Sequence, residues 1–201
     1  MRALTTYTPR DLALIAGFSV VSGIVFAITS LVLAPLVGVA GHIGIAAIYG
    51  LWFIGGTLVG YVVRRPWSAF LGETLGAIVE LLMLSPYSWM LYYYGPAQGI
   101  MTELVFRLGG YKRWDYKTMM LAGAAPVVAA YPWDCLVSPF YPACRDPGYP
   151  PELHLALIGL YIVSGAILGG VLVKAVADAA VKAGVIPRGL APRSEESTAK
   201  G

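Results

Sequence analysis

The stretch IYGLWFIGGTLVGYVVRRPWSAFLGETLGAIVELLMLS, residues 48–85, decides the fold. It consists of two apolar runs joined by the sequence RRP, and the second run contains Glu73 and Glu80. A carboxylate at the centre of a membrane span costs about 2.5 to 3.5 kcal/mol on insertion scales. Because the two glutamates are seven positions apart, close to two helical turns, they project from nearly the same face. That face must point toward a partner or a polar cavity rather than toward lipid.

The composition of the whole chain agrees with a membrane protein. Of its 201 residues, 58% are hydrophobic and only 12% are charged, whereas soluble domains contain about 25% charged residues. Apolar runs of about 20 residues suit transmembrane helices, and the alternating pattern of barrel strands is absent. We therefore expect an all-α integral membrane protein of the plasma membrane, with one membrane domain in residues 1–186. Residues 187–201 are expected to form a disordered polar cytoplasmic tail.

The apolar runs predict a single bundle of six transmembrane helices. The start of the fourth span stays open, because Gly95 and Pro96 fit either its first turn or an interruption in a helix that begins near Tyr87. It ends near Arg107. The other five spans are expected at about residues 11–36, 43–63, 67–84, 117–137 and 154–173.

The distribution of basic residues predicts the topology. Of the 14 Lys and Arg residues, all but Arg145 fall in the amino terminus, the second and fourth connections, or the carboxyl-terminal segment. By the positive-inside rule, both termini are cytoplasmic. The net charge of +3 therefore reflects topology, and we expect no nucleic-acid partner. Glu80 then lies about 8 Å inside the outer surface, so it is a better ligand contact than the deeper Glu73.

Aromatic and amide side chains complete a candidate binding site. Tyr49 and Trp52, three residues apart, can stand opposite the glutamates inside the bundle. A pocket with carboxylates and aromatic faces suits a flat, cationic organic solute. The further candidates for ligand contact are Gln98, Trp133 and Asp134.

Several polar residues have a structural as well as a functional interpretation. Glu103 and Arg107, four residues apart, predict an ion pair, and Glu73 is expected to pair with Arg107 or with a loop arginine. His42 is expected to be a solvated loop histidine. The aromatic segment 85–96 fits either an interfacial belt or a lid over an outward-opening site.

Small residues and cysteines leave two further alternatives. In the first span, Ala13 and Gly17 form one register of small residues, and Ser19, Gly23 and Ala27 form another. Such registers favour close helix approach, either to a docking partner or within the bundle. Cys135 and Cys144, in a segment expected outside the cell, form either a disulfide or two free thiols.

Motifs for catalysis are absent. The chain has no phosphate-binding loop, no H-E-x-x-H sequence and no nucleophile motif above chance. We therefore expect no enzymatic activity, no metal and no cofactor, and any energy for uphill transport must come from another subunit.

A set of short sequences, in this order along the chain, resembles the YkoE family. The sequences are IYGLWFI at 48–54, RRP at 64–66 followed by Glu73 and Glu80, Gln98-Gly99 with Glu103 and Phe106, and Gly169-Gly170 with KAVAD at 174–178. Members of that family are substrate-binding S components of energy-coupling factor (ECF) transporters. The resemblance implies capture of thiamin or its hydroxymethylpyrimidine part from outside, and docking on a transmembrane coupling subunit that carries two ATPases.

The resemblance also bears on individual residues. It implies ligand contacts at Glu80, Gln98, Tyr49 and Trp52, and the loop with the two cysteines has no match in the family pattern. A rival interpretation is a structural or assembly membrane protein without a small-molecule ligand, in which the glutamates are merely paired and the aromatics form belts.

Overall fold

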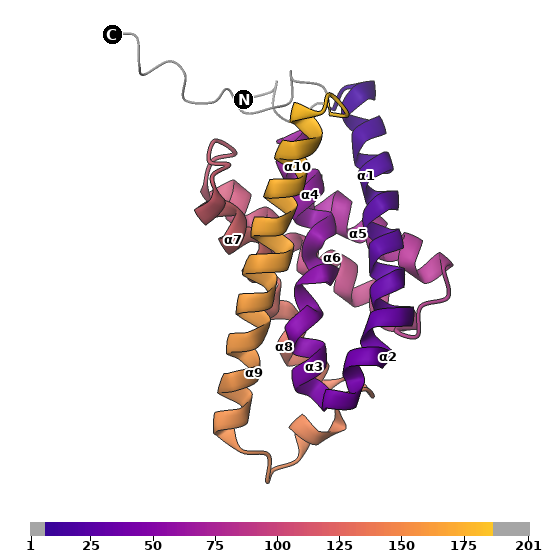
Figure 1. Ribbon diagram of the computed structural model, residues 1–201, viewed down its shortest axis with the longest axis vertical. Helices are drawn as coiled ribbons and strands as arrows, with labels where there is room; N and C mark the ends of the chain where they lie inside the picture. Colours follow the sequence, from indigo (N-terminus) through magenta and orange to yellow (C-terminus); the bar gives the residue numbers. More distant parts are fainter. Residues whose placement is uncertain (1–6, 187–201) are drawn as a thin grey trace.

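The computed structural model describes residues 7–186, and in this part of the chain every regular element is a helix (Figure 1). Residues 187–201, expected to be a disordered tail, lie outside the described residues. The elements, in chain order, are α1 (Pro9–Ile28), η2 (Thr29–Leu33), α2 (Ala34–Val37), η3 (Gly38–Ala40), α3 (Gly41–Ile48), η4 (Tyr49–Phe53), α4 (Ile54–Val63), α5 (Ser68–Leu82), η5 (Ser88–Met90), α6 (Leu91–Leu108), α7 (Tyr116–Ala124), α8 (Val127–Leu136), η6 (Pro142–Arg145), α9 (Pro151–Ser164), η7 (Gly165–Leu172) and α10 (Val173–Lys182).

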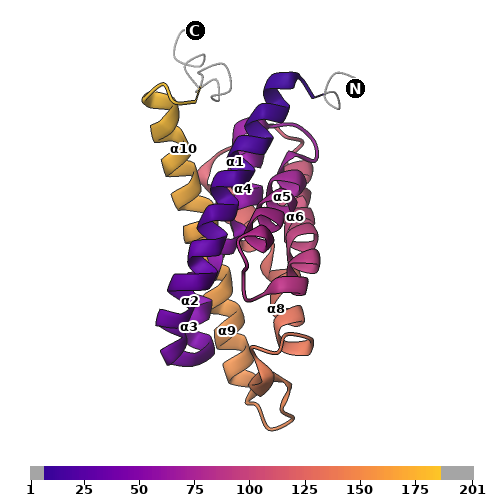
Figure 2. The same ribbon diagram turned by 90° about the vertical axis from the view of Figure 1, so that its right-hand side faces the viewer.

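Four continuous helical stretches are long and apolar enough to cross a membrane. They run along the long axis of the molecule, and the start of α1 lies at the same end as the end of α10 (Figure 1, Figure 2). Their bounds are Pro9–Leu36, Gly38–Val63, Tyr116–Leu136 and Pro151–Lys182. Helices α5 and α6 occupy the positions of the expected third and fourth spans. At 15 and 18 residues they are shorter or more polar, and a count of six spans stays a prediction.

Two of the long stretches contain π-helical turns. Residues Thr29–Leu33 continue α1 as the π-helix η2, and Gly165–Leu172 continue α9 as η7. A π-turn accommodates one extra residue and is frequent at functional sites. In the first stretch it carries Ser30, whose side chain points into the bundle.

The two registers of small residues on α1 have different surroundings. Ser19, Gly23 and Ala27 are buried, and a Cβ atom on Gly23 would lie 2.4 Å from Cβ of Val79 on α5. This register therefore serves close packing within the bundle. Gly17, in contrast, is exposed and has nothing within 4 Å of its Cβ position, and Ala13 is exposed beside it.

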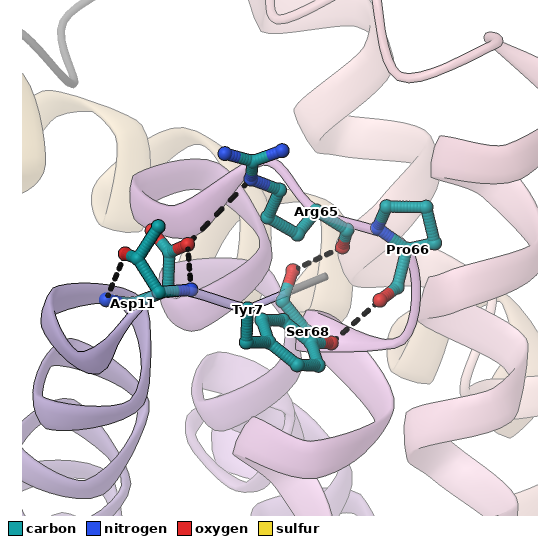
Figure 3. Close-up of polar contacts among 6 residues, drawn as sticks. Tyr7, Asp11, Arg65, Pro66 and Ser68 are labelled. Atoms are coloured by element: carbon teal, nitrogen blue, oxygen red, sulfur yellow. Dashed lines mark hydrogen bonds and ion pairs between the residues drawn. The ribbon is translucent and has the colours of Figure 1, made fainter. Parts of the chain in front are cut away.

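The amino end of α1 is fixed to the connection between α4 and α5 (Figure 3). Thr8 caps the helix and forms a reciprocal capping box with Asp11. The other carboxylate contact of Asp11 is with Arg65 at 3.6 Å. The Tyr7 hydroxyl donates to the Pro66 carbonyl at 2.5 Å. The first and third expected spans are thus joined at the end of the bundle where the basic residues gather.

The prediction that Glu103 pairs with Arg107 was wrong. The carboxylate of Glu103 instead accepts hydrogen bonds from the backbone amides of Trp67 at 2.5 Å and Ala69 at 3.0 Å, and from the Tyr111 hydroxyl at 2.6 Å. Amides in the first turn of a helix have no partner within the helix, so Glu103 on α6 caps the start of α5. The i, i+4 spacing gave no sign of this long-range partner.

Proline shapes the two helices whose course the sequence left open. The fourth apolar segment begins with the 3₁₀ turn η5, which leads directly into α6, and α6 contains Pro96 in its interior. In the next segment Pro126 separates α7 from α8. Proline cannot donate to the carbonyl four residues earlier, and for Pro126 that carbonyl belongs to Ala122. The Thr102 hydroxyl donates to it at 3.2 Å, so the break stays satisfied inside the membrane.

One end of the bundle holds the cysteines and His42. Cys135, on α8, is joined to Cys144 by a disulfide, with the two Cα atoms 5.3 Å apart. The prediction of a solvated loop histidine was wrong: His42 lies on α3, stacks on Tyr141 with ring centroids 4.2 Å apart, and contacts the Tyr161 hydroxyl at 2.9 Å. Aromatic rings from distant segments cover it.

Candidate ligand-binding site

A cavity inside the bundle collects the residues that the sequence singled out. Its empty volume, with adjoining open space included, is about 350 Å³. Its walls come from α1, η4, α5, α6 and the connection before η5. The lining residues are Phe26, Tyr49, Trp52, Glu73, Ala77, Glu80, Tyr87, Leu91, Tyr94, Gly95 and Gln98.

Four of the six candidate contacts lie together in this lining, namely Glu80, Gln98, Tyr49 and Trp52. Tyr49 and Trp52 share the 3₁₀ segment η4, in which residues three apart eclipse one another. Their ring centroids are accordingly 5.3 Å apart. The wall of the cavity therefore presents two neighbouring aromatic groups on one side and helix α5 with its carboxylates on another.

Glu80 is 1% exposed and is oriented by hydroxyl groups. Its Oε1 accepts hydrogen bonds from Ser30 Oγ at 2.5 Å and from Ser85 Oγ at 2.8 Å. Ser30 Oγ in turn accepts from Trp52 Nε1 at 3.0 Å. These donors are neutral, so they fix the carboxylate in place but supply no opposite charge. A buried carboxylate held in this way favours a cationic or amino-bearing ligand.

Glu73 lies in the same lining, but its partner differs from the predicted one. Glu73 Oε2 accepts a hydrogen bond from the backbone amide of Gly56 at 2.5 Å. Gly56 is in the first turn of α4, so Glu73 caps that helix. The predicted pairing with Arg107 was wrong, since no ion pair joins these residues in the part of the chain that the structure describes. Arg65 lies against Asp11 instead.

Asp134 and Trp133 are outside the lining and stand behind it. The carboxylate of Asp134 accepts hydrogen bonds from the hydroxyls of Tyr94 and Tyr161, the latter at 2.8 Å. Tyr94 lines the cavity, and the Tyr161 ring stacks on Tyr49 with centroids 4.2 Å apart. Asp134 thus holds two walls of the cavity. Trp133 stacks on Tyr93 at a centroid distance of 3.8 Å.

The aromatic segment 85–96, for which the sequence allowed either an interfacial belt or a lid, has some rings on the outside of the bundle and others in the cavity. Trp89 and Tyr92 are exposed on the outside of the bundle, as an interfacial belt requires. Tyr87 and Tyr94 line the cavity. The sequence signalled the segment as a whole but not which of its rings point inward, because the turn at η5 sets their directions.

Tyr87 also borders a second, outer cavity formed by α3, the connection 85–88 and the loop with the disulfide. Ser30 and His42 line this outer cavity too. Burial raises the pKa of Tyr87 to about 12, so its hydroxyl, neutral at pH 7 even in an exposed tyrosine, stays protonated over a still wider pH range. Its ring lies between the outer cavity and the candidate site.

Comparisons with known proteins all match components of membrane transport systems. Residues 10–129 match the family model described as the permease component of an ABC-type cobalt transport system. A protein of Bacillus subtilis (strain 168) named as an HMP/thiamine permease protein, YkoE, is 31% identical over 183 residues, covering 91% of this chain and 89% of that protein. A crystal structure of an S-component of an ECF transporter superposes with a TM-score of 0.83 at 31% identity, covering 92% of this chain and 91% of that one.

Proposed function

This chain belongs to the YkoE family of ECF-transporter S components, multi-pass proteins of the plasma membrane, and from that premise we propose that its cavity captures thiamin or hydroxymethylpyrimidine from outside. The relative in Bacillus subtilis is named for these two ligands. The residues that line the cavity support the same two ligands for this chain.

The observation that carries the proposal is the meeting of Glu80 and Gln98 with Tyr49 and Trp52 around one cavity. Thiamin combines a permanently cationic thiazolium with a flat aminopyrimidine. Glu80 can offset the charge or accept from the amino group, the Gln98 amide can pair with the pyrimidine edge, and the rings of Tyr49 and Trp52 can stack on the ligand. Hydroxymethylpyrimidine uses the amide and the carboxylate but not the charge compensation.

Asp134 and Trp133 have an indirect role in this proposal. Asp134 positions Tyr94 and Tyr161 through their hydroxyls, and Trp133 supports α6 through Tyr93. Both act on the shape of the site rather than on the ligand itself.

The proposed topology has six spans, with both termini in the cytoplasm. Thirteen of the 14 basic residues are assigned to that side. The start of α1 and the end of α10 lie at one end of the molecule (Figure 2), which an even number of spans requires. The candidate site then faces outward through Tyr87 and the outer cavity.

Transport energy in this proposal comes from partners. S components work with a transmembrane coupling subunit and ATPase subunits, and we assign the coupling subunit to the exposed face of α1 at Ala13 and Gly17. That face is open, and residues this small allow a helix to approach closely.

The experiment that tests the proposal is identification of the small molecule that copurifies with the protein, by mass spectrometry of the extracted sample. Titration calorimetry with thiamin and with hydroxymethylpyrimidine follows on ligand-free protein. Tight binding of either compound supports the proposal. Binding of neither would favour the structural or assembly role, in which Glu73 and Glu80 only join helices within the bundle.

A further inference from the structure

A long apolar groove lies on the flank of the bundle formed by α7 and α8, and Figure 1 shows α7 on the side opposite α1. Its empty volume, with adjoining open space included, is about 1350 Å³, and it shares no lining residue with the candidate ligand site. The residues that line it are Val105, Leu108, Gly109, Arg113, Thr118, Leu121, Ala124, Ala125, Val127, Val128, Tyr131, Pro132, Ile158 and Ile162.

The groove follows from the break between α7 and α8. The helix is interrupted at Ala125 and Pro126, and the small side chains of Ala124 and Ala125 leave space where larger residues would fill it. The carbonyl freed by the proline is satisfied from inside the bundle by Thr102. The carbonyl of Ala122 is therefore not left unpaired beside the groove, and a hydrocarbon chain can lie over the break without depriving that carbonyl of its partner.

The walls of the groove face the surroundings of the bundle. Leu108, Leu121 and Val128 are 88%, 63% and 70% exposed. In a membrane protein such side chains contact lipid, because exposing this much apolar surface to water would be unfavourable.

One end of the groove is basic. Arg113 is its only charged lining residue, and it makes no hydrogen bond or ion pair with any residue in the range 7–186. Lys112 and Lys117 are exposed beside it. The neighbouring acid, Asp115, caps α7 by accepting from the Thr118 amide at 2.9 Å, and this bond lowers the pKa of Asp115. With three positive groups and one negative group, the segment has a net charge of +2.

From the apolar walls and the basic end together, we propose that the groove binds one anionic phospholipid. An acyl chain lies along α7 and α8, and the phosphate lies at Arg113. From Thr118 to Pro132 the helices rise about 20 Å, more than the roughly 15 Å that one leaflet contributes to the hydrocarbon core. The groove is thus long enough for a whole acyl chain. Basic pockets at membrane helices bind anionic headgroups by the same charge complementarity.

Native mass spectrometry of the full-length protein in detergent tests this, with phosphatidylglycerol and phosphatidylcholine of identical acyl chains added separately after delipidation. The wild type is expected to retain phosphatidylglycerol preferentially. Arg113→Gln should reduce that preference about fivefold, the equivalent of one basic group near the headgroup. The matched control is Arg145→Gln in the loop with the disulfide, which should leave the preference unchanged.

A second pair of variants tests the apolar part. Ala125→Phe places a large ring in the groove and should reduce retention of both lipids. The control is Ala156→Phe, on an exposed position of α9 outside the groove, which should retain them. Thiamin binding should persist in all four variants, so failure of the lipid site is distinguishable from failure of the proposed transport function.

Three results would overturn the proposal. The first is equal retention of the two phospholipids by the wild type. The second is displacement of phosphatidylglycerol by an equal concentration of inorganic phosphate, which would indicate an anion site that needs no acyl chain. The third is loss of assembly with the coupling and ATPase subunits in Ala125→Phe while lipid retention is unchanged, which would make the groove a protein interface.

Discussion

Ser30 and Glu80 are 50 positions apart in the chain, and the hydroxyl of the first donates to the carboxylate of the second at 2.5 Å. This bond joins the first membrane stretch to α5 at the wall of the cavity. Because Ser30 also accepts from Trp52 Nε1, an aromatic wall and the carboxylate are fixed relative to each other before any ligand arrives.

Glu80→Gln should weaken thiamin binding by about 1.5 to 3 kcal/mol, the range for a hydrogen bond to a charged group. The amide keeps the shape and can still accept from Ser30, so the loss reports the charge. Hydroxymethylpyrimidine should lose less, because it carries no permanent charge. Titration calorimetry with the two compounds measures the difference.

The matched control for that substitution is Glu103→Gln. Glu103 is also a buried carboxylate, 3% exposed, but it caps α5 outside the cavity. Its replacement should lower stability and leave affinity unchanged. Glu73 is a less clean control, because it lines the cavity as well as capping α4. Unchanged thiamin affinity in Glu80→Gln would move the site elsewhere.

Gly17→Leu should abolish uptake and leave ligand binding intact. The added side chain meets nothing within 4 Å of the Cβ position, so the fold has room for it, whereas a docked helix would be pushed away. Uptake in cells and binding by purified protein are both measured. Gly23→Leu, on the packed register, should instead unfold the protein, because Val79 occupies that space. Normal uptake in Gly17→Leu would show that α1 is not the docking surface.

Asp134→Asn should reduce ligand affinity although the residue does not reach the cavity. An amide has one acceptor oxygen where the carboxylate has two, so either Tyr94 or Tyr161 loses its partner at a cost of about 1 to 3 kcal/mol in the free energy of unfolding. A double-mutant cycle with Tyr94→Phe should be non-additive for affinity. Tyr93→Phe serves as the control, since that hydroxyl donates to the Ala129 carbonyl. Additive effects would show that Asp134 does not act through Tyr94.

Removal of the disulfide should lower stability without changing the fold. The bond spans nine positions, and closure of a loop of that length stabilises by about 2 to 3 kcal/mol. Thermal unfolding should therefore shift downward on addition of reductant in the wild type and not in a variant with Ala at both Cys135 and Cys144. Two thiols that alkylate in untreated, non-reduced protein would contradict this.

The proposed topology makes a direct prediction for labelling in intact cells. In the background with Ala at Cys135 and Cys144, a cysteine that replaces Asp146 should react with a membrane-impermeant reagent. A cysteine that replaces Lys112 should react only after permeabilisation. The opposite pattern would invert the orientation of the whole bundle.

Helix periodicity was enough to predict part of the site. Glu73 and Glu80 were expected on one face of a helix, and both line the cavity. Tyr49 and Trp52 were expected to stand together, and they do. Such predictions succeed because the contacts depend on spacing within single helices, which the sequence shows directly.

The parts that were missed depend on tertiary contacts. Glu73 and Glu103 accept hydrogen bonds from backbone amides rather than pairing with arginines. Every residue except proline has such an amide, so the sequence does not indicate which one is the partner. The partners of Asp134 are 40 and 27 positions away. Pro126 divides the segment that carries Trp133 into α7 and α8, so a single helical periodicity does not run through it and the face of Trp133 could not be read from spacing. Each of these features needs the packing of separate helices.

The π-turn Thr29–Leu33 has a consequence for how relatives of this protein can differ in length. Both the exposed Gly17 and the hydroxyl that orients Glu80 belong to one continuous helix, with the turn at the second of them. Because a π-turn absorbs one extra residue, deleting one residue between positions 29 and 33 would restore ordinary α-helical winding and leave the faces before and beyond the turn in nearly the same relation. An alignment gap at this point would therefore mark a homologue that lacks the extra residue but keeps its docking face and its ligand cavity on the same sides of the helix.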